Sequence, residues 1–221
     1  MTILTEIQHA AEFIVSEAAG CRSREAVTLI SGQDLDAGTV LGQLTKDTVA
    51  VAHAAGNTGD ADLSAVAVTL GAHAVPGTYT LTCTNADSAG SEVFRVQTPS
   101  GEVLPDLTTA VPYSGGPIGL TLPAADAGGG ETGYALADVV EIAVSGSGKF
   151  TQLDQDAADG SQLPAGILYA AVDASGGDAS AVIVARDAEV NGNELVWPSD
   201  ITVGETATAI AALALAGVIV R

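Results

Sequence analysis

Short apolar runs separated by glycine-bearing turns recur along this chain, and they constrain its fold more than any other feature. The runs are too short for ordinary helices. Several alternate apolar and polar residues with the period of two that is typical of half-buried strands. The clearest runs occupy residues 27–30, 38–44, 65–70, 77–83, 92–97, 118–122, 139–144, 166–170 and 181–185. This pattern predicts a mainly β protein.

A single helix is expected, near the end of the chain. Gly204 or Thr206 would cap its start, and it would run to about residue 216. Gly217 suits the position just after a helix, and residues 218–220 would form a last strand. The many alanines allow close packing, either on the chain's own sheet or on another subunit. The expected apolar contacts of the helix are Ile210, Leu213 and Leu215.

The charge balance excludes a nucleic-acid partner. The 221 residues include 27 Asp and Glu but only seven Lys and Arg, which gives a net charge of −20. The basic residues are scattered, whereas binding to a phosphate backbone requires clustered cations. A strongly acidic surface instead keeps a protein soluble.

No catalytic, cofactor or metal motif occurs in the sequence. Lys149 is followed by Phe150 where a phosphate-binding loop needs Ser or Thr, and neither G-x-S-x-G nor H-E-x-x-H is present. Residues 154–165 resemble a calcium loop, but the glycine comes one place late and the final glutamate is missing. We therefore predict no enzyme, no cofactor and no metal site. The dispersed histidines are His9, His53 and His73.

The remaining sequence signals concern the cellular compartment. Cys21 and Cys83 lack C-x-x-C spacing, so neither zinc binding nor a disulfide is expected. Residues 1–12 lack the basic start of a signal peptide. The longest apolar run, residues 207–220, is shorter than the ~20 residues that cross a bilayer. We expect a soluble cytoplasmic product without a membrane partner.

The order of several short motifs indicates a family. Residues 159–198 contain the series DG, GIL, VD, AVIV, AEVN and LVWP, in that order. EFIVSEA at residues 12–18 precedes this series, and GVIVR at residues 217–221 follows it. Taken together, these motifs resemble the lambda-type head decoration proteins of tailed bacteriophages. The resemblance covers roughly the first 54 and the last 72 residues.

The resemblance implies a homotrimeric cement protein on the outer surface of the expanded phage head, assembled in the host cytoplasm. Its partner would be the major capsid protein. The implied fold is a small β-clip-like domain with one C-terminal helix, formed by residues 19–56 and 149–221. Residues 57–148 depart from the family pattern, and their spaced strands predict an inserted β-sandwich-like domain that projects outward.

The resemblance also implies that an N-terminal arm, residues 1–18, grips the capsid. Addition of an extended segment to a sheet edge is the physical route we expect. A terminus without function is the alternative. Trp197 and Pro198 are expected to organise the domain, or to lie at the base of the trimer. The residues expected to contact the capsid are Ile3, Leu4, Ile7, Phe13 and Val15.

A second function remains open at this point. The inserted domain could act as an adhesin for glycans or a host surface, with the decoration domain as its anchor. Such a role requires an exposed aromatic cluster, and strand alternation predicts that Tyr79 and Phe94 are buried. The aromatic residues available in the inserted region are Tyr79, Phe94, Tyr113 and Tyr134.

Overall fold

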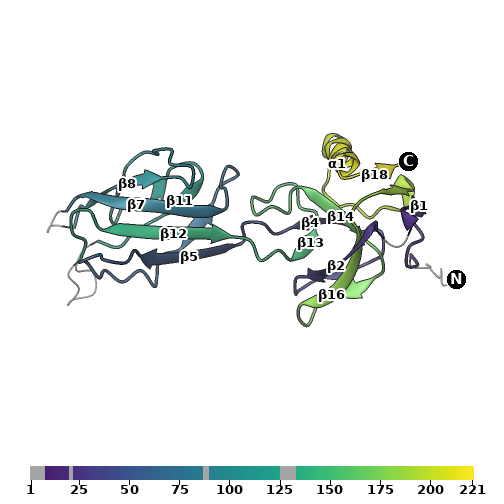
Figure 1. Cartoon of the computed structure of the whole chain (residues 1–221), viewed down its shortest axis with the longest axis horizontal. Helices are drawn as coiled ribbons and strands as arrows, with labels where there is room; N and C mark the ends of the chain where they lie inside the picture. Colours follow the sequence, from purple (N-terminus) through teal and green to yellow (C-terminus); the bar gives the residue numbers. More distant parts are fainter. Residues whose placement is uncertain (1–7, 20–21, 87–89, 125–132) are drawn as a thin grey trace. The chain divides into compact units, whose positions relative to one another are not determined.

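The chain folds into two compact units, one of which is assembled from both ends of the sequence. The computed structural model describes residues 8–19, 22–86, 90–124 and 133–221. The discontinuous unit comprises Met1–Thr45 and Gly148–Arg221, and the middle unit comprises Lys46–Ser147 (Figure 1). The mainly β fold with one C-terminal helix is confirmed.

The discontinuous unit is organised around a closed barrel of five strands. The strand order is β13-β2-β16-β14-β4, so the two strands from the N-terminal part, β2 and β4, lie among three from the C-terminal part. β4 pairs antiparallel with both β13 and β14. The five strands are β2 (Arg24–Leu29), β4 (Val40–Gln43), β13 (Phe150–Gln152), β14 (Pro164–Leu168) and β16 (Ala179–Val184).

A second sheet of three strands lies in the same unit. β17 (Ala188–Val190) is its central strand. It pairs antiparallel with β1 (Ile14–Glu17) and parallel with β18 (Val218–Val220). β3 (Asp34–Leu35) and β15 (Val172–Asp173) form a separate two-stranded sheet. A short 3-10 helix, η2 (Gly192–Glu194), follows β17.

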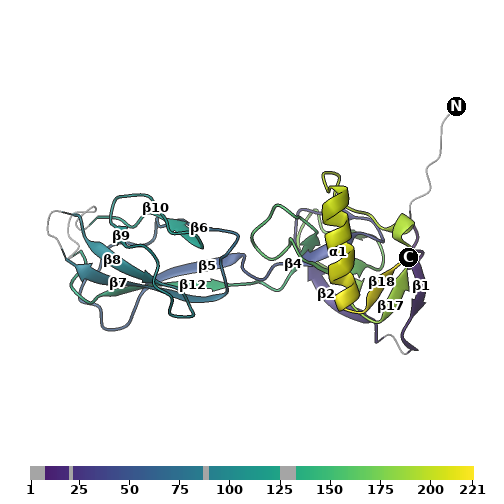
Figure 2. The ribbon, with the colours of Figure 1, turned by 90° about the horizontal axis from the view of Figure 1, so that it is seen from above.

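Helix α1 (Val203–Leu215) packs beside β18 and β14 (Figure 2). The predicted caps were wrong: Thr202 is the N-cap, and it forms a reciprocal capping box with Glu205. The helix stops at Gly217, whose φ of 84° is a left-handed conformation that suits glycine. Ala209 and Leu213 are its buried residues. The predicted packing of Leu215 was also wrong, since this side chain is 91% exposed.

The middle unit consists of two sheets that share one core. One sheet has the strand order β5-β12-β7-β8-β9, and the other has the order β10-β11-β6. Tyr79, Leu81, Phe94 and Ile142 are fully buried between them, as a sandwich requires. The strands are β5 (Thr48–His53), β6 (Val68–Leu70), β7 (Gly77–Asn85), β8 (Val93–Gln97), β9 (Leu107–Thr108), β10 (Tyr113–Ser114), β11 (Ile118–Leu120) and β12 (Val139–Ser145).

The first boundary between the units differs from the sequence-based expectation. Residues 46–56 were assigned to the discontinuous core, but β5 lies in the middle unit. The reason is that β5 pairs with β12 along its whole length, from Thr48 opposite Ser145 to His53 opposite Val140. The division therefore falls between residues 45 and 46 rather than between residues 56 and 57.

The two points at which the chain leaves and re-enters the discontinuous unit are neighbours. The Leu44 amide donates to the Lys149 carbonyl at 2.9 Å, and the Gly148 amide donates to the Leu44 carbonyl at 3.0 Å.

We predict that replacing residues 46–147 with a two-residue Asn-Gly turn leaves a unit that unfolds in one cooperative transition. Circular dichroism during urea titration checks this, and a transition without cooperativity would contradict it.

A buried carboxylate holds together a loop corner of the middle unit. Asp138 accepts hydrogen bonds from the backbone amides of Thr58, Gly59 and Ala135 at 2.7–2.9 Å. Burial alone would raise the pKa of Asp138, but these hydrogen bonds outweigh it and lower the pKa below its usual value. The ionised form is therefore the one that stabilises the fold.

We predict that Asp138→Asn lowers the free energy of unfolding of the middle unit by about 1–3 kcal/mol at neutral pH. Because the folded pKa is depressed, the stabilisation is present above the unfolded pKa of about 4 and is lost as pH falls through the folded value. Urea unfolding of both proteins at neutral and acid pH measures this effect. An equal difference between them at both pH values would contradict the ionised role.

Candidate binding surfaces

Much of the segment expected to be a free N-terminal arm belongs to the folded unit. The Ala11 amide donates to the Tyr169 carbonyl at 2.9 Å, and the Asn191 amide donates to the Phe13 carbonyl at 2.8 Å. The Ala18 amide donates to the Asp187 carbonyl at 3.0 Å. β1 therefore completes the sheet of β17 and β18, and residues 8–18 are held along their length.

The predicted contact residues of this segment differ in how far their side chains are exposed. Phe13 is only 1% exposed and lies in the core cluster that includes Val190, Leu213 and Val218. Val15 points the other way and is 59% exposed. Phe13 thus stabilises the unit itself, whereas Val15 is accessible to a partner. Ile3, Leu4 and Ile7 lie outside the described residues.

The Gln8 side chain attaches the N-terminal segment to Glu194 of the discontinuous unit. Its side-chain Nε2 donates to the carbonyl of Glu194 at 2.6 Å and to the Glu194 carboxylate at 3.0 Å. Gly38 lies against this contact with a φ of 81°, and a Cβ there would come within 2.5 Å of the Glu194 carbonyl oxygen. Only glycine allows this close approach. Gln8 is therefore held against the discontinuous unit.

A partly buried charge cluster joins the end of β1 to the barrel. The Glu17 carboxylate accepts from Arg24 Nε at 3.0 Å and from Ser23 Oγ at 2.6 Å. The Arg24 hydrogen bond first, and the Ser23 hydrogen bond second, lower the pKa of Glu17 below its usual value. Arg24 also lies over the Tyr169 ring, 4.2 Å from its centroid. The cluster fixes the orientation of β1.

Trp197 and Pro198 both lie within the discontinuous unit, but their surroundings differ. Trp197 is partly buried against the core that contains Phe13. The residue before it, Val196, accepts from the Val40 amide at 3.1 Å. Pro198 lines an open hollow of about 500 Å³ together with Gln33 and other polar residues. A role at a subunit interface stays a prediction.

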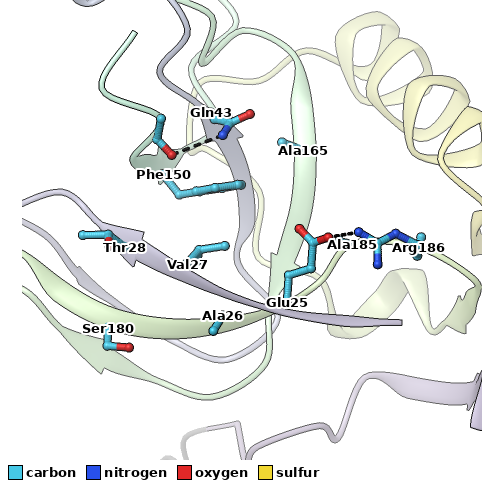
Figure 3. Close-up of a pocket in the computed structure, with 11 residues that line it drawn as sticks. Glu25, Ala26, Val27, Thr28, Gln43, Phe150, Ala165, Ser180, Ala185 and Arg186 are labelled. Atoms are coloured by element: carbon cyan, nitrogen blue, oxygen red, sulfur yellow. Dashed lines mark hydrogen bonds and ion pairs between the residues drawn. The ribbon is translucent and has the colours of Figure 1, made fainter. Parts of the chain in front are cut away.

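The barrel has an open hollow of about 700 Å³ beside β2 (Figure 3). β2 pairs with β16 along its whole length but with β13 only at Leu29. The strand edge at Ala26 consequently borders the hollow, and an extended peptide could add there. Figure 3 shows Phe150 and Val27 lining it, with the Glu25–Arg186 ion pair at one end. Its lining contains no catalytic combination of side chains.

The middle unit presents no aromatic platform among its described residues. Tyr79 and Phe94 are fully buried, and Tyr113 and Tyr134 are at most 9% exposed. Stacking on sugar rings needs accessible aromatic faces, so the described side chains do not favour the adhesin hypothesis. Its most exposed large apolar side chains are aliphatic: Val75, Val103, Val111 and Leu136.

The acidic residues examined for calcium binding are engaged in local turns. Asp154 Oδ1 accepts from the Asp156 amide at 3.1 Å, and Asp159 Oδ1 accepts from Ser161 Oγ at 2.6 Å. Within the described ranges, no three His, Cys, Asp or Glu side chains are grouped so that they could hold a metal ion. In the same ranges, no helix has the length and apolar character needed to span a membrane.

Comparisons with known proteins give one extensive match. The sequence profile of the family described as "Bacteriophage lambda head decoration protein D" matches residues 3–93 and 95–218. No curated protein sequence matches the chain. Among solved structures, two crystal forms of Xanthomonas campestris FlgL are similar at 14% identity and a TM-score of 0.31. These matches cover 52% of this chain and 34% and 33% of the FlgL chains.

The opposite exposure of Phe13 and Val15 gives a paired prediction. Phe13→Ala removes a buried aromatic side chain and should lower the free energy of unfolding of the discontinuous unit by about 3–5 kcal/mol. Val15→Ser, two residues further along in β1, should change it by less than about 0.5 kcal/mol. Urea denaturation of the two variants makes the comparison. Equal destabilisation would contradict the opposite exposure of these two side chains.

Proposed function

This chain belongs to the family of bacteriophage lambda head decoration protein D, and from that premise we propose that it binds the outside of the expanded phage head as a homotrimer and stabilises it. The family match along nearly the whole chain is the observation that carries this proposal. Family membership supports a structural role at the phage capsid. The major capsid protein is the proposed partner.

The proposed mechanism is selective binding to one state of the shell. When the lattice expands, composite sites that span several capsid subunits form, and the decoration protein binds only those sites. A ligand that binds one state stabilises it by RT ln(1 + [L]/Kd), so decoration lowers the free energy of the expanded shell relative to competing states. Three attachment points on one trimer strengthen weak single contacts through their effective concentration.

We propose that the N-terminal residues before Gln8 provide these attachment points. An extended chain spans at most about 3.3–3.6 Å per residue, so any segment of seven residues can span at most on the order of 23 Å. The segment contains Ile3, Leu4 and Ile7 but only one charged side chain, Glu6. A nearly neutral, partly apolar segment suits addition to a sheet edge of the capsid protein. Val15 is a further candidate contact.

Mixing the purified protein with expanded and unexpanded heads tests the mechanism. We expect saturable binding to expanded heads, weak or absent binding to unexpanded heads, and an increased temperature of head disruption after decoration. Sedimentation of heads followed by quantification of bound protein measures occupancy. Equal occupancy of the two kinds of head would contradict selective cementing.

A second measurement tests the attachment segment. Deleting residues 1–7, or making Ile3→Ser, Leu4→Ser and Ile7→Ser together, should reduce head occupancy at least about tenfold, because apolar contacts of a few kcal/mol are lost. The matched control is Thr2→Ser with Thr5→Ser, which changes the same segment without removing its large apolar side chains. Unchanged circular dichroism would show that the fold persists. Full occupancy by the deletion variant would contradict the assignment.

A further inference from the structure

Strand β5 forms an open edge of the sandwich in the middle unit. It is the end strand of the five-stranded sheet, and among the described residues only β12 pairs with it (Figure 1). The pairing register with β12 is unbroken, so no bulge turns β5 away from a further partner. Its sequence, TVAVAH, contains no proline and no Lys, Arg, Asp or Glu. β5 therefore lacks the features with which natural edge strands prevent the addition of another strand.

The pairing with β12 shows which backbone groups of β5 point outward. The Ala54 amide donates to the carbonyl of Val139, the residue opposite it in the register that continues from β5. Pairing groups alternate along an antiparallel strand, so every second residue back from Ala54 bonds to β12. The amides and carbonyls of Val49, Val51 and His53 consequently point to the open edge. They offer hydrogen-bonding groups to an extended segment.

An open hollow of about 430 Å³ adjoins this edge. It is lined by residues of β5, of β6 at the end of the second sheet, and of the segment that precedes β6. Its larger aliphatic side chains pack against the core of the middle unit but are only partly buried. A segment added to β5 would place every second side chain in this hollow. We call it the β5 groove, and its larger aliphatic residues are Val49, Val51, Leu63, Val66 and Val68.

Acidic side chains flank the β5 groove. The backbone amide of Ser64, which lines the groove, donates to the exposed Asp62 carboxylate at 2.8 Å, and hydrogen bonds from Ser64 hold the pKa of Asp62 below its usual value. Asp47, also exposed, directly precedes β5. The only Lys and Arg residues of the middle unit are Lys46, which is 7% exposed, and Arg95, which lies on β8 beyond β12 and β7. The edge thus favours a segment with positive charge.

We propose that the β5 groove binds an extended segment of another protein, with aliphatic side chains at alternate positions and basic residues at its ends. The main chain of this segment extends the five-stranded sheet, its aliphatic side chains fill the groove, and its cations lie near Asp47 and Asp62. A second copy of this chain fits less well, because a net charge of −20 on each molecule opposes their approach. This function goes beyond head decoration and belongs to the middle unit.

Fluorescence anisotropy with the full chain and a labelled peptide of sequence KVTVTVTK tests the proposal. We expect saturable binding that weakens as salt is added. The matched controls are two N-methylated versions of this peptide, one methylated on its valines and the other on its threonines. Only one of these sets of amides can face β5, so the two affinities should differ at least about tenfold. Equal affinities of the two versions, or no saturable binding of the parent peptide, would overturn the proposal.

Variants of the chain locate the site. Val51→Lys places a cation in the groove and should weaken binding of the parent peptide at least about tenfold. Asp62→Asn should weaken it about threefold at low salt, because one exposed ion pair is lost. Asp106→Asn is the matched control, since it removes the same charge from an exposed position just before β9, at the opposite end of the sheet. Circular dichroism checks the fold of each variant. Equal effects of the two asparagine variants would contradict the role of the flanking charge.

Self-association and head attachment give the competing outcomes. Association of the wild-type chain that is lost in Val51→Lys, together with no binding of the peptide, would assign the groove to a second copy and overturn the proposal. Head occupancy of Val51→Lys should equal that of the wild-type protein, because the proposed attachment residues belong to the discontinuous unit. A parallel loss of head occupancy and peptide binding would contradict the separation of the two functions.

Discussion

The pairing of β4 with both β13 and β14 is the interaction on which the rest of this structure depends. It joins strands from opposite ends of the sequence into one barrel, and it brings Leu44 into direct backbone hydrogen bonding with Gly148 and Lys149. Because the two crossing points are adjacent, a complete domain can be inserted between them at little entropic cost. The long middle unit is therefore compatible with a compact discontinuous unit.

Packing within the discontinuous unit also fixes the start of the described chain. The Phe13 side chain packs in a core with residues from β17, α1 and β18, so the N-terminal segment is fixed from Gln8 onward. Gln8 thus has a defined position at the start of the described chain. The helix that covers this core buries only Ala209 and Leu213. Leu215, the last residue of this helix, is 91% exposed.

The sequence was most informative where a local pattern has one structural solution. The apolar runs at residues 166–170 and 181–185 correspond to β14 and β16, and Gly217 ends the helix as expected. A strand over residues 12–16 would place Phe13 and Val15 on the same face, because side chains alternate with a period of two. In the structure Phe13 precedes β1, whose pairing with β17 is irregular between Ile14 and Ser16, and only Phe13 is buried. Helical spacing likewise could not reveal that Leu215 is exposed. Alanines occur on every face of this helix, so the sequence does not mark one face as the buried one.

Both ends of the chain must form a single cooperative unit, distinct from the middle one, if β4 joins them as described. Native-state hydrogen exchange tests this requirement directly, since amides that open together share one free energy of opening. Slowly exchanging amides of β2 and β4 should share their opening free energy with those of β14 and β16, and should differ from those of β7 and β12. Independent opening of residues 22–45 and 148–221 would contradict the account.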